Sequence, residues 1–330
     1  MFARANFDQY ATGDRSIANA GVFRGLRRLP PGLVRSGLLG ATWLETWLRW
    51  PLATLKMGDQ IDATLSAIDA DGTRFGLTAP KRRAIKRNLL YGQLPDLVAL
   101  MNTVDQPALR GRTLSFRGSD ILARECEAGP GAIVAGFRTG PYPAFPWALA
   151  AAAPRRDVLM IVGTDHLAAL AERLGRTFMG DLTSRVTFVS AQDSGVLARS
   201  MQALKAGGIV ATLLELSPVE FARKTEVHFL DWNVEVPYGF SYLSAMTGRP
   251  VIPAALTRRR GTRFRLGFSE PVPAAERNQQ SIKQQTQVLY SELERRLLRN
   301  PEQWVGWLLL ESNMGIHLPV TGGRPLPALS

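Results

Sequence analysis

The chain has 330 residues, of which 45% are apolar and 21% are charged. This is the composition of a globular protein, and the length suffices for one large domain or two modest ones. The single cysteine, Cys126, excludes an internal disulfide and favours a protein that faces the cytosol. The net charge of +12 favours an anionic partner, such as nucleic acid, an anionic membrane or an acidic protein. A solvated basic face accounts for the same charge equally well.

Residues 33–57 have an amphipathic helical pattern. No window of the chain reaches the ~18 uncharged apolar residues of a membrane-spanning helix, and the N-terminus lacks the apolar core of a signal peptide. Three tryptophans cluster on the apolar side of the pattern, opposite a charged stripe: Trp43, Trp47 and Trp50. Such a face suits a water–lipid interface, and it equally suits a helix packed on the protein's own core. Pro51 is expected to kink or restart the helix.

A basic helical run follows at residues 80–92, where Pro80 marks the helix start. Its cations are Lys81, Arg82, Arg83, Lys86 and Arg87. The cluster is either a solvated face or a surface that docks onto phosphates or an acidic protein.

Helical and strand patterns alternate from about Ser119 onwards. Helices are predicted at residues 119–129 with Ser119 as cap, 143–153, 165–175 with Asp165 as cap, 194–208, from about 239, and 281–299. Strands are predicted at residues 131–137, 156–163, 185–191, 209–216, 250–256 and 263–272. Because the strand runs are continuously apolar, they predict an α/β sheet that is buried on both faces.

Ligands of such sheets bind beyond the carboxyl ends of the strands. These ends fall at residues 138–142, 163–165, 215–218 and 257–260. The loop after the first strand therefore lies at a predicted site, yet no His, Asp, Glu, Ser or Cys stands between Phe137 and Ala144.

Five segments of the chain are similar, in order and spacing, to segments of one known family. They are RRAIKRNLL (82–90), FRGSDILARECEAGPGAIVAGFRTGPYPAFPWALA (116–150), ALKAGGIVATLLEL (203–216), VHFLDWNVEVPYGFSYLSAMTGRPVIPAAL (227–256) and NPEQWVGWLLL (300–310). The chain resembles the lipid A biosynthesis (lauroyl/myristoyl) acyltransferase family, within the glycerolipid-acyltransferase-like superfamily. The resemblance implies an α/β fold like that of glycerol-3-phosphate acyltransferases, with a mixed, largely parallel sheet flanked by helices and with N-terminal amphipathic helices. We expect an N-terminal helical segment at 1–79, the acyltransferase-like domain at 80–312 and a tail at 313–330.

The family's catalytic motif is a histidine followed five positions later by an acid. The histidine acts as general base and the carboxylate orients its imidazole. Aligned on Gly140, the histidine position carries Arg138 and the acid position carries Pro143, while Pro141 and Tyr142 replace the motif's Asn and Trp. Arginine stays charged and cannot act as a base, but it can bind a phosphate, carboxylate or carbonyl oxygen. The chain is thus expected to be a divergent member that keeps the loop and lacks its proton-transfer pair.

Three histidines are alternative candidates for the base. His166 opens the helix beyond the second strand, next to Asp165; His228 lies in the family's aromatic-rich loop; His317 lies in the tail. None is followed by an acid five positions later. Each is as readily structural as catalytic.

Glu215 ends a strand where the family has Asp-Gln and this chain has Glu-Leu. It is a candidate base, or a structural carboxylate paired with an arginine such as Arg223; Asp231 is a further acid near the aromatic-rich loop. The residues expected to bind substrate are Gly140, Tyr142, His166, Glu215, Arg223, His228 and Tyr238, of which Tyr238 lies in the Pro-x-Gly helix start.

Other chemistry finds no support in the sequence. No Cys/His spacing predicts a metal site, and no phosphate-binding loop, dinucleotide fingerprint or Gly-x-Ser-x-Gly elbow occurs. The basic clusters lack the aromatic pattern of RNA platforms, so we expect neither a cofactor nor nucleic acid.

The resemblance implies transfer of an acyl chain from acyl carrier protein or acyl-CoA to an unknown acceptor, by a peripheral protein on the anionic cytoplasmic face of the inner membrane. Catalysis would then rest on positioning and on Arg138 stabilising oxyanion charge, best with an amine or thiol acceptor. The alternative is an inactive homologue that binds acyl chains, carrier protein or a partner enzyme. A general anion-binding or nucleic-acid-binding protein is a third reading.

Overall fold

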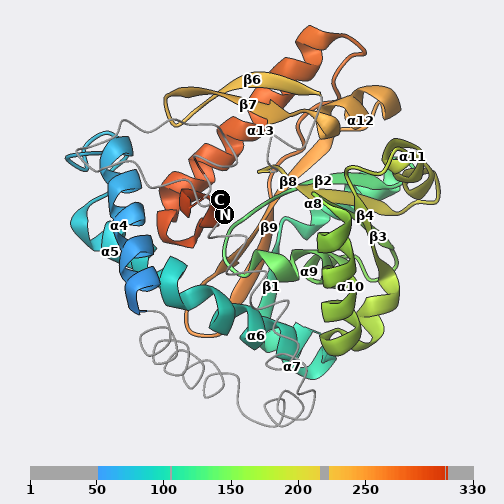
Figure 1. Ribbon diagram of the computed structural model, residues 1–330. Coiled ribbons are helices and arrows are strands. Elements are labelled where there is room, and N and C mark those ends of the chain that lie inside the picture. Colours follow the sequence, from blue (N-terminus) through green and yellow to red (C-terminus); the bar gives the residue numbers. More distant parts are fainter. Residues whose placement is uncertain (1–50, 105, 216–222, 309, 311–330) are drawn as a thin grey trace.

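A seven-stranded sheet forms the centre of the fold (Figure 1). The computed structural model describes residues 51–104, 106–215, 223–308 and 310. The strand order is β1-β9-β8-β2-β5-β3-β4. The strands are β1 (Leu114–Arg117), β2 (Ala132–Phe137), β3 (Val158–Val162), β4 (Val186–Ser190), β5 (Ile209–Leu213), β8 (Val251–Arg258) and β9 (Phe264–Phe268).

Five of these strands, β8, β2, β5, β3 and β4, run parallel. Strand β9 pairs antiparallel with β8, and β1 pairs parallel with β9, so both run the opposite way. The predicted mixed, largely parallel α/β sheet is confirmed.

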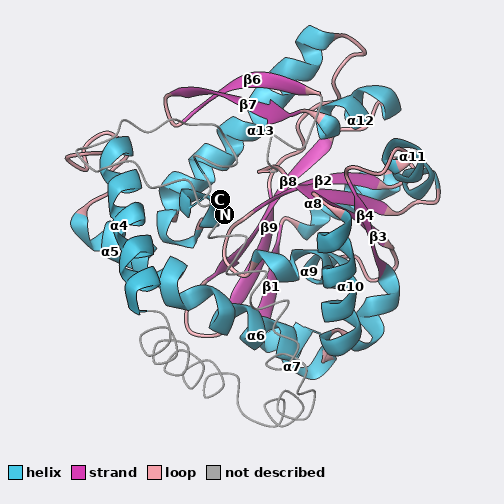
Figure 2. Ribbon diagram, in the orientation of Figure 1, coloured by secondary structure: helices cyan, strands magenta, loops and turns pink. Residues whose placement is uncertain are grey.

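Helices cover both faces of the sheet (Figure 2). They are α4 (Pro51–Ile68), α5 (Ala79–Arg87), α6 (Gln93–Val104), α7 (Pro107–Thr113), α8 (Ser119–Glu127), α9 (Phe145–Ala152), α10 (Asp165–Phe178), α11 (Val196–Lys205), α12 (Gly239–Thr247) and α13 (Gln279–Arg299). A five-residue π-helical turn, Asn88–Gly92, joins α5 to α6, and 3-10 turns occur at Tyr142–Ala144, Gly180–Arg185, Pro301–Gln303 and Val305–Leu308.

The position of β2 between two layers of helices explains why its sequence is continuously apolar. Its alternate residues Ile133, Ala135 and Phe137 belong to one buried cluster, together with residues of α4, α11, α12 and α13. Val134 belongs to the cluster on the other face, with residues of α6, α8 and α9. Because side chains alternate along a strand, a strand between two helical layers must be apolar at every position.

A two-stranded hairpin that the sequence patterns did not predict lies against α13 (Figure 2). Its strands are β6 (Lys224–Phe229) and β7 (Trp232–Pro237). The turn residues Leu230 and Asp231 have positive φ, at 49° and 65°. A two-residue hairpin turn requires this conformation, which Asn-Gly sequences normally supply, so Leu-Asp gave no turn signal.

Two predicted helix caps are wrong by one residue. Thr164 caps α10, because its hydroxyl accepts a bond of 3.3 Å from Leu167 N, and Asp165 is the first helical residue. Likewise α8 begins at Ser119 after Gly118 in the left-handed region, and the helix ends at Glu127. The four-residue strand β1 also escaped prediction.

The N-terminal predictions fall mostly outside the described residues, as do Trp43, Trp47, Trp50, Leu216 and His317. Helix α4 begins at Pro51 and ends at Ile68. Its residues Ile61, Leu65 and Ile68 are buried in the cluster shared with β2. None of the described helices combines the length and the apolar character that crossing a bilayer requires. The domain boundaries at 79/80 and 312/313 stay predictions.

A buried carboxylate fixes the connection between α4 and α5. Asp69, 1% exposed, accepts bonds from the backbone N–H groups of Arg74 (2.9 Å), Phe75 (3.2 Å) and Leu77 (2.8 Å). Charge-assisted bonds of this kind are about twice as strong as neutral ones. The carboxylate therefore holds the turn that leads into α5.

We predict that Asp69→Ala lowers the free energy of unfolding by about 3 kcal/mol, because it leaves three backbone donors without their acceptor. Urea unfolding measures the change. Asp71→Ala is the matched control, since Asp71 is exposed and its side chain bonds only Thr73, so its midpoint should stay close to that of the wild type. Equal losses in the two variants would contradict the role given to Asp69.

Candidate functional site

The loop at the carboxyl end of β2 is held by the C-terminal segment 301–305. Gly140 N donates to Gln303 O at 2.8 Å, and Val305 N donates to Arg138 O at 2.9 Å. Thr139 forms an antiparallel bridge with Trp304 between these two bonds. The loop then enters the 3-10 turn Tyr142–Ala144 and α9. Its backbone is thus fixed at the edge where α/β sheets bind ligands.

Gly140 is required by the shape of this loop. Its φ is +53°, in the left-handed region that side-chain-bearing residues avoid. A Cβ at this position would lie 2.8 Å from Leu256 O, which is backbone of β8. The glycine therefore allows the loop to approach β8, and its predicted place in the site has a steric reason.

The side chain of Glu215 is the common acceptor of the hydrogen bonds that join the loop to the C-terminal segment. The residue is 2% exposed. Its Oε1 accepts bonds from Arg138 N at 3.0 Å and from Trp304 Nε1 at 2.8 Å, and Oε2 lies 3.2 Å from Arg138 N. One carboxylate thus joins the ends of β5 and β2 to the C-terminal segment.

Burial raises the pKa of Glu215 above its usual value of 4.5. The positive charge of Arg138 and the bonds from Trp304 and from Arg138 N oppose that rise without cancelling it. A carboxylate that is enclosed and already bonded in this way cannot reach an acceptor hydroxyl in this arrangement. The suggested pairing of Glu215 with Arg223 is not found. The guanidinium of Arg223 lies over the ring of Tyr242, 5.1 Å from the centroid.

The side chain of Arg138 is half-buried, and its Nε is buried without a hydrogen-bond partner among the residues that the structure describes. Burial raises the pKa of two neighbouring phenols, Tyr142 and Tyr290; the charge of Arg138 opposes the shift and that of Glu215 adds to it. Both hydroxyls therefore stay protonated, and Tyr290 donates to Leu214 O at 2.9 Å. The cluster offers donors to an anion or a carbonyl oxygen and offers no base.

Of the three candidate histidines, His166 and His228 lie within the described residues and His317 lies outside them. His166 is exposed in the first turn of α10, at the same edge of the sheet. His228 is exposed on β6, where its Nε2 lies 3.6 Å from Asp231 Oδ1. The neighbouring Phe229 faces the other way and packs on Trp304, with centroids 5.8 Å apart. The imidazole–carboxylate pair of the hairpin thus faces solvent, away from the cluster.

The remaining predicted residues lie around α12. Tyr238 precedes this helix and packs against a small cluster that includes Ala245 and Ile282. Arg223 belongs to the same region through Tyr242. The structure therefore brings together Arg138, Gly140, Tyr142 and Glu215, and their contacts do not include Arg223, His228 or Tyr238.

The sequence analysis missed the residues that hold the C-terminal segment in place. The side chain of Gln303 bonds the backbone of Arg258 at the end of β8, accepting from its N at 2.6 Å and donating to its O at 2.9 Å. The guanidinium of Arg258 pairs with the buried Asp96 of α6 at 2.7 Å. Asn88, after α5, donates to Glu302 O at 2.7 Å. The Pro-Glu-Gln-Trp run in the sequence was the one signal for this assembly.

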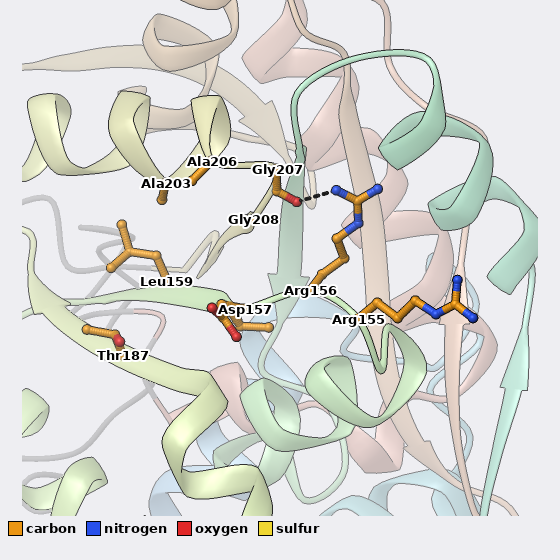
Figure 3. A pocket seen from close by; sticks show the side chains of 10 residues that line it. Arg155, Arg156, Asp157, Leu159, Thr187, Ala203, Ala206, Gly207 and Gly208 are labelled. Carbon is orange, nitrogen blue, oxygen red and sulfur yellow. Dashed lines mark hydrogen bonds between the residues drawn. The ribbon is translucent and has the colours of Figure 1, made fainter.

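Two hollows lie away from the Arg138 loop. The first, of about 290 Å³, lies at the amino ends of β3 and β5 and is drawn in Figure 3. There Arg156 Nη1 donates to Gly207 O at 2.9 Å. The second, of about 340 Å³, lies on α5 and is lined by Pro80, Arg83, Ala84 and Arg87. The first is at the edge opposite to the predicted ligand edge. Within the described part of the chain no cluster of side chains could hold a metal ion.

The comparisons with known proteins agree with the resemblance. The sequence model of the family described as bacterial lipid A biosynthesis acyltransferase matches residues 182–310. The matched part includes Glu215, the hairpin and the C-terminal segment, while the Arg138 loop precedes it. A search of curated proteins found no match. The matched part of the chain is therefore similar to the bacterial lipid A biosynthesis acyltransferases.

We predict that Gly140→Ala destabilises the protein more than Gly248→Ala. Both glycines have positive φ, but nothing lies within 4 Å of a Cβ at Gly248, whereas a Cβ at Gly140 meets the β8 backbone. The conformational strain alone costs about 1 kcal/mol, and the collision at Gly140 adds to it. Thermal unfolding of the two variants gives the comparison, and equal midpoints would show that the loop gives way freely.

We also predict a pH-dependent effect of Glu215→Gln. Because the pKa of Glu215 is raised in the folded state, its contribution to stability is fully present below about pH 4.5 and is lost as the pH rises through the folded-state pKa. The difference in unfolding free energy, wild type minus variant, should therefore fall as the pH rises from 4.5 toward neutrality. Urea unfolding across this range measures it.

Glu292→Gln is the matched control. Burial pulls the pKa of Glu292 upward, but bonds from Ser269, Arg296 and Arg295 outweigh burial and lower it below 4.5. Its contribution is present above pH 4.5 and is lost as the pH falls below that value, so the urea series for this variant extends to lower pH. The same direction of change in both variants would refute the environment assigned to Glu215.

Proposed function

We propose that the chain binds an acyl thioester at the Arg138 loop and transfers the acyl group to an acceptor that needs no strong base. The match to the lipid A biosynthesis acyltransferases supports an acyltransferase-like activity. The donor and the acceptor are part of the proposal: an acyl chain carried by acyl carrier protein or coenzyme A, and an amine or thiol.

The observation that carries the proposal is the arginine itself. Its Nε is buried and unpartnered within the described chain, while its backbone N is fixed by Glu215. A guanidinium with an unpartnered N–H can donate a hydrogen bond to a thioester oxygen. Negative charge develops on that oxygen as the carbonyl carbon becomes tetrahedral, and fixed donors in a dehydrated site stabilise it most. Tyr142, which stays protonated, is a second donor beside it.

The transfer balances without an imidazole. The lone pair of a neutral amine attacks the thioester carbon, a C–N bond forms and the C–S bond breaks. The electron pair of that bond leaves with the sulfur, which takes up the proton that the amine nitrogen loses. Because a thiol is a good leaving group and an amine a good nucleophile, positioning and oxyanion stabilisation supply the catalysis.

The net charge and the tryptophan pattern support the partners and the location that we propose. A net charge of +12 suits both an acidic carrier protein and the anionic cytoplasmic face of the inner membrane, where the chain would act as a peripheral protein. The tryptophan pattern of residues 33–57 supports the membrane contact.

The alternative is a catalytically inactive homologue that binds acyl chains, carrier protein or a partner enzyme. One observation favours it: the carboxylate nearest to Arg138 is enclosed and fully engaged in holding the loop. A site whose carboxylate only supports the loop, and takes no part in proton transfer, is suited to binding an acyl chain or a protein without turnover.

We predict that Arg138→Ala lowers kcat/KM about 10²–10³-fold, the usual loss when one oxyanion donor is removed, while Arg138→Lys retains part of the activity because it keeps the charge. The measurement is transfer of a radiolabelled acyl group from carrier-bound and coenzyme-bound donors to amines, thiols and alcohols. Arg155→Ala, an exposed arginine at the opposite edge of the sheet, is the control and should not change the rate.

The outcomes separate the two functions. No turnover over the whole panel, with acyl binding that depends on Arg138, establishes the inactive homologue. Unchanged transfer and unchanged binding in a folded Arg138→Ala protein would remove the loop from consideration as a site.

A further inference from the structure

The cations of α5 fall into two groups. Arg82 and Lys86 are engaged within the fold: Arg82 Nε donates to Leu77 O at 2.7 Å, and Lys86 Nζ lies 2.5 Å from Asp62 Oδ2. The side chains of Lys81, Arg83 and Arg87 have no ion-pair or hydrogen-bond partner within residues 51–104, 106–215, 223–308 and 310. Only the second group is available to a ligand.

The available cations form a defined surface. Arg83 and Arg87 are both exposed and lie one helical turn apart, and together with Pro80 and Ala84 they line the hollow of about 340 Å³. Lys81 is half-buried beside them in the sequence. We call Arg83, Arg87 and Lys81 the α5 basic face.

The α5 basic face stands on a rigid support. Ile85, on the inner side of the helix, is fully buried. At the end of the helix Asn88, 6% exposed, donates to Glu302 O. The next residue of that segment, Gln303, accepts the bond from Gly140 N in the Arg138 loop. The face is therefore joined to the candidate site through one short segment of chain, whose position both depend on.

The shape and composition of the face distinguish between kinds of anionic partner. A bilayer surface is flat, and proteins that rest on it usually add apolar anchors to their basic residues. Among the residues that the structure describes, those lining the α5 hollow include no large apolar side chain, and the hollow is shallow. A shallow hollow with two neighbouring guanidinium groups matches the carboxylates of an acidic segment of a protein.

We propose that the α5 basic face is the docking surface for an acidic carrier protein that delivers the acyl thioester to the Arg138 loop. The inference rests on the proposed function for its choice of carrier. Carboxylates on the carrier pair with Arg83 and Arg87, and the support through Asn88 and Glu302 orients the carrier relative to the loop. Charges at such an interface mainly set the encounter rate and the salt dependence of binding.

The test is a charge reversal with a matched control. Arg83→Glu/Arg87→Glu should weaken the binding of purified acyl carrier protein roughly tenfold at low salt and should flatten the salt dependence of its affinity. The control, Arg155→Glu/Lys205→Glu, makes the same change of charge with two exposed residues at the amino edge of the sheet. It should leave the affinity close to that of the wild type. Calorimetry or fluorescence anisotropy gives the dissociation constants.

A second measurement compares two donors. The reversal should lower kcat/KM roughly tenfold more with the carrier-bound acyl thioester than with a small acyl thioester that has no protein carrier. If the protein transfers acyl groups with neither donor, the proposed function fails while the binding measurement still decides the docking surface.

Three results overturn the inference. One is an unchanged carrier affinity in a folded Arg83→Glu/Arg87→Glu protein. Another is an equal loss in the control variant, which would show an effect of net charge alone. The third is loss of binding to phosphatidylglycerol vesicles, relative to neutral phosphatidylcholine vesicles, with carrier affinity intact; that result assigns the face to lipid.

Discussion

The buried carboxylate of Glu215 is the interaction on which the candidate site depends. It is the shared acceptor for the backbone of Arg138 and the indole of Trp304, and Trp304 is itself enclosed between Phe229 and Trp307. Removing that acceptor would leave two buried donors unsatisfied, each at a cost of about 1–3 kcal/mol. Because Glu215 fixes the backbone N of Arg138, the position of the loop depends on a side chain that is itself only 2% exposed.

The conformation of the loop does not depend on the side chains at positions 138 and 143, because backbone groups hold it. The bonds within and around it use the N–H groups of Arg138, Thr139, Gly140, Tyr142 and Ala144. Proline has no N–H, and neither Pro141 nor Pro143 is needed as a donor; Pro141 takes part only as an acceptor, through its carbonyl oxygen, from Ala144 N at 2.9 Å. The same backbone support is therefore compatible with different side chains at positions 138 and 143, and in this chain it presents the cation of Arg138.

Much of the fold could be read from local sequence, and much of the site could not. The parallel strands were predictable because each is a continuous apolar run bounded by turn residues. Helix α13 was predictable because its polar segment is long and uninterrupted by proline or glycine. The hairpin was not, because its turn is formed by Leu230 and Asp231 in a conformation that these residues seldom adopt. The strand ends placed Arg138 and Glu215 at one edge of the sheet. Their actual contacts depend on residues 77 and 89 positions from Glu215, which no local pattern specifies.

The bridge between Thr139 and Trp304 also bears on how the protein is made. During synthesis β2, which ends at Phe137, leaves the ribosome long before Gln303 and Trp304 do. Until those residues arrive, the indole and amide partners of the loop are missing and Glu215 lacks one of its two donors. The strands of the sheet are therefore synthesised before the residues that hold the Arg138 loop. Contacts between residues so far apart along the chain form slowly. A nascent chain held before this segment would lack the partners of the loop and also the core residues Trp304 and Trp307.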